Sequence, residues 1–263
     1  MVQICLPQHF LKIGHIWFAD NDMDGKQPYD MCFFHDIPKL HDPNNRHEIH
    51  NTLVSTLMEP EDSLFGHIDK RFRSCIRKGT KDNLAHRVYR SAYILNSSGL
   101  LEAFACVYHH MLADKKLPGS LHTGELLAYA RQNALLITTA SLDGRELIYH
   151  SYVHDATNAR CLHSCSDFRN VTDSGERNAY GMANKWLHWQ DMLHFKGMGI
   201  ESYDWGGVYS FDGTNGVDNF KLSFGGEPRR YYNEIVLCSL RGRALKTMAD
   251  CARKALGRKK AAK

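Results

Sequence analysis

The stretch "ESYDWGGVYSFDGTNGVDNFKLSFGGEPRRYY", residues 201–232, holds two Gly-Gly pairs with a single lysine, Lys221, between them. Gly206-Gly207 ends a short strand-like run, and Gly225-Gly226 follows Phe-Lys-Leu-Ser-Phe. Glycine permits backbone angles that other residues avoid, and it lets a ligand come close to the main chain. The pattern therefore indicates a site where backbone N–H groups and one ammonium group face an electron-rich ligand.

The hydrophobic pattern around this stretch predicts an α/β arrangement. From residue 125 the predicted order is helix, three antiparallel strands, helix, strand, helix, strand and helix. The first two strands form a hairpin around the turn signal Asp143-Gly144. Further helices are predicted over 63–78, with Ser63 as N-cap, and over 98–112. Short apolar runs at 13–18, 31–34 and 53–58 are typical of strands.

Composition places the 263-residue chain among ordinary globular proteins, with 43% hydrophobic and 24% charged residues. No apolar run predicts a transmembrane helix, and residues 1–18 lack the layout of a secretory signal. The eight cysteines form no dense framework, which favours reduced thiols and a cytoplasmic protein. Residues 239–263 carry nine basic residues and one acid, a net charge of +8 that leaves −4 on the rest. Such a tail suits RNA or the inner membrane surface, or a solvated helix.

Two linked motifs resemble those of FemABX-like peptidoglycan-bridge aminoacyltransferases, which belong to the GNAT superfamily. "HWQDMLHFKGMGIESYDWGGV" (188–208) is similar to the family's helix, glycine and Tyr-Asp-Phe/Trp-Gly-Gly strand end. "VDNFKLSFGGE" (217–227) is similar to its Phe-Lys-x-x-Phe-Gly-Gly element. Weaker likenesses lie in "RFRSCIRKGTKDN" (71–83) and "GLLEAFACVYHHMLADKKLP" (99–118). The resemblance covers roughly residues 63–237.

The resemblance implies an α/β (α+β) fold with a GNAT-like mixed, mostly antiparallel sheet flanked by helices. The expected domains are a shorter, degenerate GNAT-like N-terminal half on the acceptor side (1–118), a C-terminal GNAT-like acyltransferase domain (119–240) and a basic helix or tail (241–263). The chain departs from the family's usual members in its short first half and in lacking a helical arm.

Acyl transfer to an amine needs a polarised carbonyl, a stabilised oxyanion and a neutral amine. The resemblance implies that Lys221 polarises the carbonyl and that Phe220 packs against the acyl-bearing end of the donor. Asp204, at the end of a central strand, is expected to orient or deprotonate the amine; a cap of the following Gly-Gly turn is the alternative. For Lys221 the alternative is a surface lysine on a short amphipathic helix. The remaining expected site residues are donor-binding Ser164, Ser166, Arg169, Gly225 and Gly226, and acceptor-binding Tyr203, Trp205, Arg77 and Lys78.

The expected reaction forms an amide on an amino group of a cell-envelope glycan or peptide precursor, an activity in cell envelope biogenesis. No tightly bound cofactor is expected; the co-substrate is acyl-CoA or aminoacyl-tRNA. The glycine-rich pyrophosphate loop of CoA-dependent GNAT enzymes is replaced by "RNVTDSGERNAYG" (169–181), which favours tRNA, whereas the small size favours CoA. Two alternatives stay open: an acyl-CoA-dependent N-acetyltransferase acting on a sugar nucleotide or small amine, and a non-catalytic module that binds tRNA or a membrane surface.

Sixteen histidines and the pattern Cys161-x-His163-x-Cys165 raise the question of a metal site. The three side chains are expected to share one strand face, where successive ligands stand about 7 Å apart. No second cluster with ligand spacing follows. No metal site is predicted, and Cys165 beside His163 is considered only as a weak candidate nucleophile.

Overall fold

The structure is a computed structural model that describes residues 1–8, 10–19 and 27–244. The chain divides into two compact units: the described parts of Met1–His50 with Arg230–Lys263, and Asn51–Arg229. Two strands, β4 (Arg46–Thr56) and β10 (Glu227–Leu237), contribute residues to both units. Each unit is described by itself below.

The first unit is a small mixed sheet. Its strands are β1 (Val2–Gln8), β2 (Leu11–Trp17), β3 (Met31–Ile37), most of β10 and the start of β4. β1 pairs antiparallel with β2, β2 parallel with β3, and β3 antiparallel with β10. Its core is made by Ile16, Cys32, Phe34 and Ile37, each at most 2% exposed. The runs predicted as strands near 13–18 and 31–34 are therefore confirmed.

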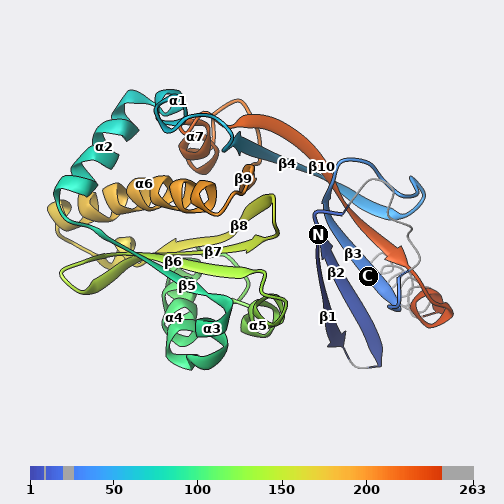
Figure 1. The fold of residues 1–263 in the computed structure, drawn as a ribbon. Helices are drawn as coiled ribbons and strands as arrows, with labels where there is room; N and C mark the ends of the chain where they lie inside the picture. The colour runs from blue at the N-terminus through green and yellow to red at the C-terminus, as the bar shows by residue number, and fades with distance from the viewer. Residues whose placement is uncertain (9, 20–26, 245–263) are drawn as a thin grey trace, which may run out of the picture. The chain divides into compact units, whose positions relative to one another are not determined.

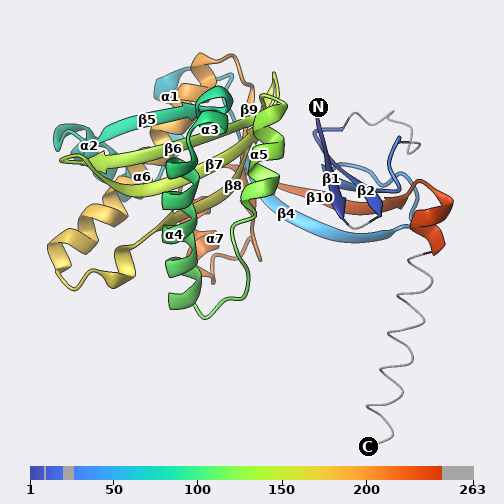
Figure 2. The same cartoon turned by 90° about the horizontal axis from the view of Figure 1, so that it is seen from below.

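The second unit is a layered α/β domain that holds the candidate site. Its sheet runs in the order β4-β9-β8-β7-β6-β5. α6 and α2 cover one face, and α3, α4 and α5 cover the other (Figures 1 and 2). The strands are β5 (Ala85–Arg90), β6 (Leu135–Leu142), β7 (Arg145–His154), β8 (Asn158–Ser166) and β9 (Ser202–Gly207); the helices are α1 (Glu61–His67), α2 (Lys70–Lys81), α3 (Ser91–Asn96), α4 (Ser98–Asp114), α5 (Thr123–Arg131), α6 (Ser174–Gly197) and α7 (Gly216–Leu222), with a 3-10 turn η1 (Phe168–Asn170).

Local signals account for the central hairpin. β6 and β7 meet at a two-residue turn in which Asp143 has φ 50° and Gly144 φ 81°, the left-handed angles that Asp-Gly favours. Helix α6 begins after Asp173, whose carboxylate accepts a hydrogen bond from the Glu176 amide at 2.7 Å. The large apolar face of α6 packs on the sheet, and each fully buried side chain there stabilises the fold by about 1.5–3 kcal/mol. The predicted hairpin and the helix predicted after the three antiparallel strands are confirmed.

The single helix predicted over 63–78 is wrong, because the structure has two helices there. Ile68 is extended, with ψ 138°, and ends α1. Asp69 then caps α2 by accepting a hydrogen bond from the Arg71 amide at 2.7 Å. Pro60, not Ser63, is the N-cap residue of α1. The apolar spacing continued through the break, so only the capping aspartate marked it.

The predicted mixed, mostly antiparallel sheet with flanking helices is confirmed. Residues on both sides of position 118 belong to the second unit, and the division into two GNAT-like halves stays a prediction. Most of the predicted basic helix over 241–263 lies outside the described residues. None of the described helices is both long and apolar enough to cross a membrane.

Candidate functional site

The site lies where two parallel strands separate. β8 and β9 pair from Asn158 with Ser202 to Arg160 with Asp204, and the ladder ends there. Both strands continue beyond this point, β8 to Ser166 and β9 to Gly207. A pocket of about 820 Å³ opens between the diverging ends. The divergence leaves the backbone of β8 available to an extended ligand.

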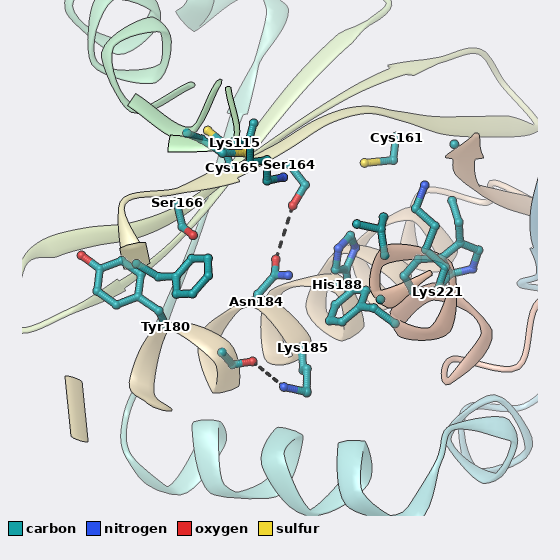
Figure 3. A pocket seen from close by; sticks show the side chains of 18 of the residues that line it. Lys115, Cys161, Ser164, Cys165, Ser166, Tyr180, Asn184, Lys185, His188 and Lys221 are labelled. Carbon is teal, nitrogen blue, oxygen red and sulfur yellow. Dashed lines mark hydrogen bonds between the residues drawn. The ribbon is translucent and has the colours of Figure 1, made fainter. Parts of the chain in front are cut away.

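One face of α6 forms the wall of this pocket. Arg177, Tyr180, Gly181, Asn184 and His188 recur at three- and four-residue steps and all line it. Figure 3 shows Tyr180 and Ser166 toward one end, Asn184 between, and His188 and Lys221 toward the other. The Ser164 hydroxyl lies 3.5 Å from Oδ1 of Asn184, which links β8 to α6 across the cavity.

Lys221 lies in the pocket, as its place between the glycine pairs indicated. It comes from α7, whose N-cap Asn215 accepts a hydrogen bond from the Val217 amide at 2.8 Å. The Lys221 ammonium donates to the carbonyl oxygen of Gly207 at 2.7 Å. Burial lowers the pKa of Lys221, and the nearby Arg160 acts in the same direction. An ammonium has three N–H donors, so two stay available to a ligand.

The two Gly-Gly pairs have different structural roles: one lines the pocket and the other does not. Gly206 and Gly207 line the pocket. At Gly206, φ is 74°, and a Cβ would lie 2.8 Å from the carbonyl oxygen of Cys161 and 3.7 Å from Nζ of Lys221. Gly225 and Gly226 do not line this pocket. A Cβ on Gly225 would lie 2.7 Å from the His67 carbonyl oxygen, so this glycine permits a close backbone approach.

Asp204 sits behind the pocket wall, 8% exposed, and is not among the lining residues. Its Oδ1 accepts hydrogen bonds from the Thr52 hydroxyl at 2.6 Å and from the Gly206 amide at 2.7 Å. This geometry is that of the strand-end cap that the sequence left open as the alternative. The expected role of Asp204 in orienting or deprotonating the amine stays a prediction.

The other expected donor residues are brought together, and the expected acceptor residues are not. Ser164, Ser166, Arg169 and Phe220 all line the pocket. Of the acceptor set only Trp205 does; its indole N–H donates to Ser55 at 2.9 Å.

Tyr203 is fully buried behind this wall. Arg77 and Lys78 lie on α2 outside the pocket lining, where Arg77 stacks over Phe65 at 5.1 Å and Lys78 pairs with Asp82. Roles for these three residues in acceptor binding stay predictions.

Positive charge dominates the pocket. None of the described residues that line it is acidic, and six are basic: Lys115, Arg160, Arg169, Arg177, Lys185 and Lys221. Burial lowers the pKa of Lys115, and the charge of Arg169 lowers it further. A cavity in which cations disfavour one another suits a ligand with several negative charges.

The expectation that Cys161, His163 and Cys165 share one face of a strand is wrong. Ser151 pairs with His163 and Tyr152 pairs with Cys161, so Leu162 is an extra residue, a β-bulge. The bulge interrupts the alternation of side chains. His163 therefore contacts Tyr108 of α4, with ring centroids 5.1 Å apart, whereas Cys161 lies in the pocket. Burial raises the pKa of Cys161 to about 12 and that of Cys165 above its usual range, which disfavours a thiolate nucleophile at either position.

Sequence reasoning missed a buried polar network beneath the site. Its members come from three elements: His150 and Tyr152 of β7, His188 and Asp191 of α6, and Tyr203 of β9. Asp191 accepts hydrogen bonds from Tyr152 at 2.7 Å and from the Nδ1 of His150 at 2.8 Å. Two signals were present, the i, i+3 spacing of His188 and Asp191 and the i, i+2 spacing of His150 and Tyr152.

One ligand atom from each of His150, His188 and Asp191 lies within 4.8 Å of the others, a spacing at which a metal ion can bind. In the structure, however, these groups hydrogen-bond within the protein: His150 with Asp191, and Nδ1 of His188 with Tyr203 at 2.8 Å. We interpret the cluster as a hydrogen-bond network.

No protein-family model matches the sequence, and no curated protein is detectably similar to it. Solved structures are similar in fold. The C-terminal domain of a putative lysylphosphatidylglycerol synthetase from Agrobacterium fabrum matches with TM-score 0.56 and 13% identity, over 94% of this chain and 83% of that one. FemX matches with TM-score 0.58 and 13% identity, over 82% and 68%.

A structure of L-PGS from Bacillus licheniformis also matches, with TM-score 0.51 and 11% identity, over 86% of this chain and 73% of that one. The chain therefore has a FemABX-like fold, which it shares with these three structures. The fold that the Tyr-Asp-Trp-Gly-Gly and Phe-Lys-Leu-Ser-Phe-Gly-Gly motifs implied is thus confirmed.

Proposed function

We propose that the chain is an acyltransferase that moves an acyl or aminoacyl group from an anionic donor to an amino group. One observation carries the proposal. Lys221 and the edge of β8 that no longer pairs with β9 border the same pocket, which five other basic residues also line. The fold is shared by FemX, by L-PGS and by the C-terminal domain of a putative lysylphosphatidylglycerol synthetase, which supports transfer chemistry.

Lys221 acts on the carbonyl that is attacked. Its ammonium is held at one end by the Gly207 carbonyl, so its direction is restrained. Its two other N–H groups can donate to a carbonyl oxygen as negative charge develops there. Lys221 is partly buried, and its partial removal from water strengthens this interaction. Phe220, one residue earlier on α7, provides an apolar contact for the acyl end of the donor.

The donor is anchored by its phosphates. Further positive charge comes from Arg169, Arg177 and Lys115, which line the same pocket as Lys221. The free edge of β8 can pair with an amide-containing arm. Both acyl-CoA and aminoacyl-tRNA carry phosphates. The absence of the glycine-rich loop in residues 169–181 favours the tRNA.

The acceptor is an amino group of a cell-envelope glycan or peptide precursor, with action in the cytoplasm or at the inner membrane surface. In this proposal Asp204 holds the Gly206 turn in place, and Trp205 contacts the acceptor. An acyl-CoA-dependent N-acetyltransferase acting on a sugar nucleotide or small amine is the second candidate. The basic residues of the pocket favour it as much as they favour tRNA.

Thermal-shift measurements with CoA, acetyl-CoA and aminoacyl-tRNA test the donor, since a ligand of the folded state raises the melting temperature. The donor that binds is then assayed with amino-sugar nucleotides and with peptide precursors that carry a free amino group. Lys221→Ala is expected to lower kcat by about 10²–10³-fold. The control Lys185→Ala removes a pocket cation of similar charge and is expected mainly to raise KM. Equal effects of the two substitutions on kcat, or no stabilisation by any donor, would contradict the proposal.

A further inference from the structure

A continuous line of hydrogen bonds runs from the pocket into the core. Nδ1 of His188 lies 2.8 Å from the Tyr203 hydroxyl, which lies 2.8 Å from the Tyr152 hydroxyl. Tyr152 in turn lies 2.7 Å from Oδ2 of Asp191. The other oxygen of Asp191 lies 3.0 Å from Nε2 of His86, a side chain that is 17% exposed. All members except His86 are buried, and His188 lines the pocket.

Counting hydrogens fixes the direction of this line. An ionised carboxylate only accepts, so the single hydrogen of Tyr152 points to Asp191. The short contact between the two tyrosines then requires the hydrogen of Tyr203, because two lone pairs would repel there. Nδ1 of His188 must therefore carry the hydrogen in its bond to Tyr203. A neutral His188 is left with an unprotonated Nε2, the nitrogen that the network does not occupy.

His150 does not change this count. Its Nδ1 lies 2.8 Å from the same oxygen of Asp191, so it donates there and accepts nothing from Tyr152 at 3.1 Å. Its Nε2 lies 2.9 Å from the side-chain amide of Asn184. With Nδ1 donating to Asp191, this contact requires either a second proton on His150 or the NH2 of Asn184 turned toward Nε2, and in both cases Nδ1 of His150 remains a donor. His150 and His86 thus both favour an ionised Asp191, the acceptor at the inner end of the line.

We propose that His188 is the proton acceptor of the reaction and that Tyr203 and Tyr152 relay the proton to Asp191. The inference rests on the proposed function, because it assigns the base of that same site. His188 is near the carbonyl group that Lys221 would hold: its ring lies 5.6 Å from that of Phe220, the neighbour of Lys221.

The step is balanced within the transfer. As the amine nitrogen forms its bond to the carbonyl carbon, its N–H bond breaks and Nε2 of His188 takes the proton. The Nδ1 proton passes to Tyr203, that of Tyr203 to Tyr152, and that of Tyr152 to Asp191, which becomes a neutral carboxylic acid. When the carbon–oxygen or carbon–sulfur bond of the donor breaks, the relay runs back. Nε2 of His188 then gives a proton to the leaving oxygen or sulfur.

The relay explains how a buried histidine can act as a base. Burial, with the neighbouring His150, lowers the pKa of His188 well below its usual value, so a lasting imidazolium is disfavoured. Burial raises the pKa of Asp191, but hydrogen bonds from His150 and His86 outweigh this effect and hold that pKa below its usual range. This low pKa keeps Asp191 ionised between turnovers, so the carboxylate holds the relayed proton only until the donor bond breaks. Burial raises the pKa of both tyrosines, so they stay protonated between turnovers.

The tautomer of His188 is the direct test, and it needs no substrate. Nitrogen-15 NMR of the full chain, with long-range proton correlation, is expected to report a protonated Nδ1 and an unprotonated Nε2 at pH 7. Tyr203→Phe removes the acceptor, and Tyr152→Phe frees Tyr203 to donate to Nδ1, so both are expected to shift His188 toward the Nε2–H form. The matched control is Tyr129→Phe, because Tyr129 is also buried and its hydroxyl also bonds a carboxylate, that of Glu125 at 2.9 Å. An Nε2–H tautomer in the unaltered chain, or no change in either tyrosine variant, overturns the proposal.

Steady-state kinetics, with the donor and acceptor that the thermal-shift and activity screens identify, supply the second readout. His188→Gln is expected to lower kcat by about 10²-fold or more. Tyr203→Phe and Tyr152→Phe should each lower kcat about 10-fold with an unchanged KM, and both should reduce the solvent deuterium isotope effect on kcat. A raised KM with an unchanged kcat would assign the tyrosines to packing and overturn the relay. A chelator that abolishes activity, restored by zinc, would assign the cluster to a metal and likewise overturn it. The tautomer result stands apart from donor binding, so failure of the proposed function and failure of the relay are distinguishable.

Discussion

Replacing Gly206 by alanine tests the close backbone approach at the mouth of the site. At φ 74° an L-residue costs about 1 kcal/mol relative to glycine. The new Cβ would also lie 2.8 Å from the Cys161 carbonyl oxygen, and such overlap in a packed region costs about 1–3 kcal/mol. Gly206→Ala is therefore expected to lower the free energy of unfolding by about 2–4 kcal/mol.

Gly144→Ala is the matched control for the backbone angle. Gly144 has φ 81°, lies in the same unit, and a Cβ there would have no neighbour within 4 Å. Its replacement should cost only about 1 kcal/mol. Urea unfolding of both variants and the unaltered chain at pH 7, with the slopes compared, measures the difference. Equal losses in the two variants would refute the reasoning, because the overlap with Cys161 would then cost nothing.

Gly206→Ala should also affect donor binding. Nζ of Lys221 and a guanidinium nitrogen of Arg160 lie 3.7 and 3.8 Å from the position of the added Cβ. Relief of the overlap with Cys161 displaces the strand end and changes the place of both cations. Gly206→Ala should therefore weaken donor binding, whereas Gly144→Ala should leave it unchanged.

Three further substitutions test single contacts by urea unfolding. Asp204→Asn should lower the free energy of unfolding by about 1–3 kcal/mol, because its charge-assisted hydrogen bonds become neutral; unchanged stability with lost turnover would instead support its role as a base. Ser55→Ala should cost about 1–3 kcal/mol, since it leaves the buried indole N–H of Trp205 without its acceptor, and a loss below 0.5 kcal/mol would contradict this. Burial, aided by Arg160, lowers the pKa of His163 to about 4, below its unfolded value of about 6.5, so the unfolded chain binds the extra proton as pH falls. Between pH 7 and pH 4.5 the unaltered chain should lose about 2–3 kcal/mol more than His163→Gln, and equal losses would contradict the assignment.

Features set by neighbouring residues were predictable from the sequence. Asp143-Gly144 specified a two-residue turn, and the hairpin of β6 and β7 followed from it. Lys221 was placed at the pocket by a motif in which the glycines and the lysine lie within 20 residues of one another. Such signals depend on backbone preferences that act locally.

Features set by tertiary contacts were not predictable in the same way. Gly206 and Gly225 look alike in the sequence, yet one faces the pocket and the other faces the backbone of His67. The bulge at Leu162 changed which residues of β8 share a face, and nothing in its composition marks it. In the network around Asp191 a single hydrogen bond joins His86 to Asp191, 105 positions apart, so the parts of the network were visible as spacings but not as a cluster.

The concentration of basic groups around the pocket has a practical consequence for anyone handling the protein. Six like charges facing one space repel each other in the unliganded chain, and any small multivalent anion relieves that repulsion. Phosphate or sulfate in a purification buffer should raise the melting temperature by itself and occupy the place of the true ligand. A ligand screen in a zwitterionic buffer at low ionic strength should therefore detect binding that the same screen in phosphate-buffered saline would miss.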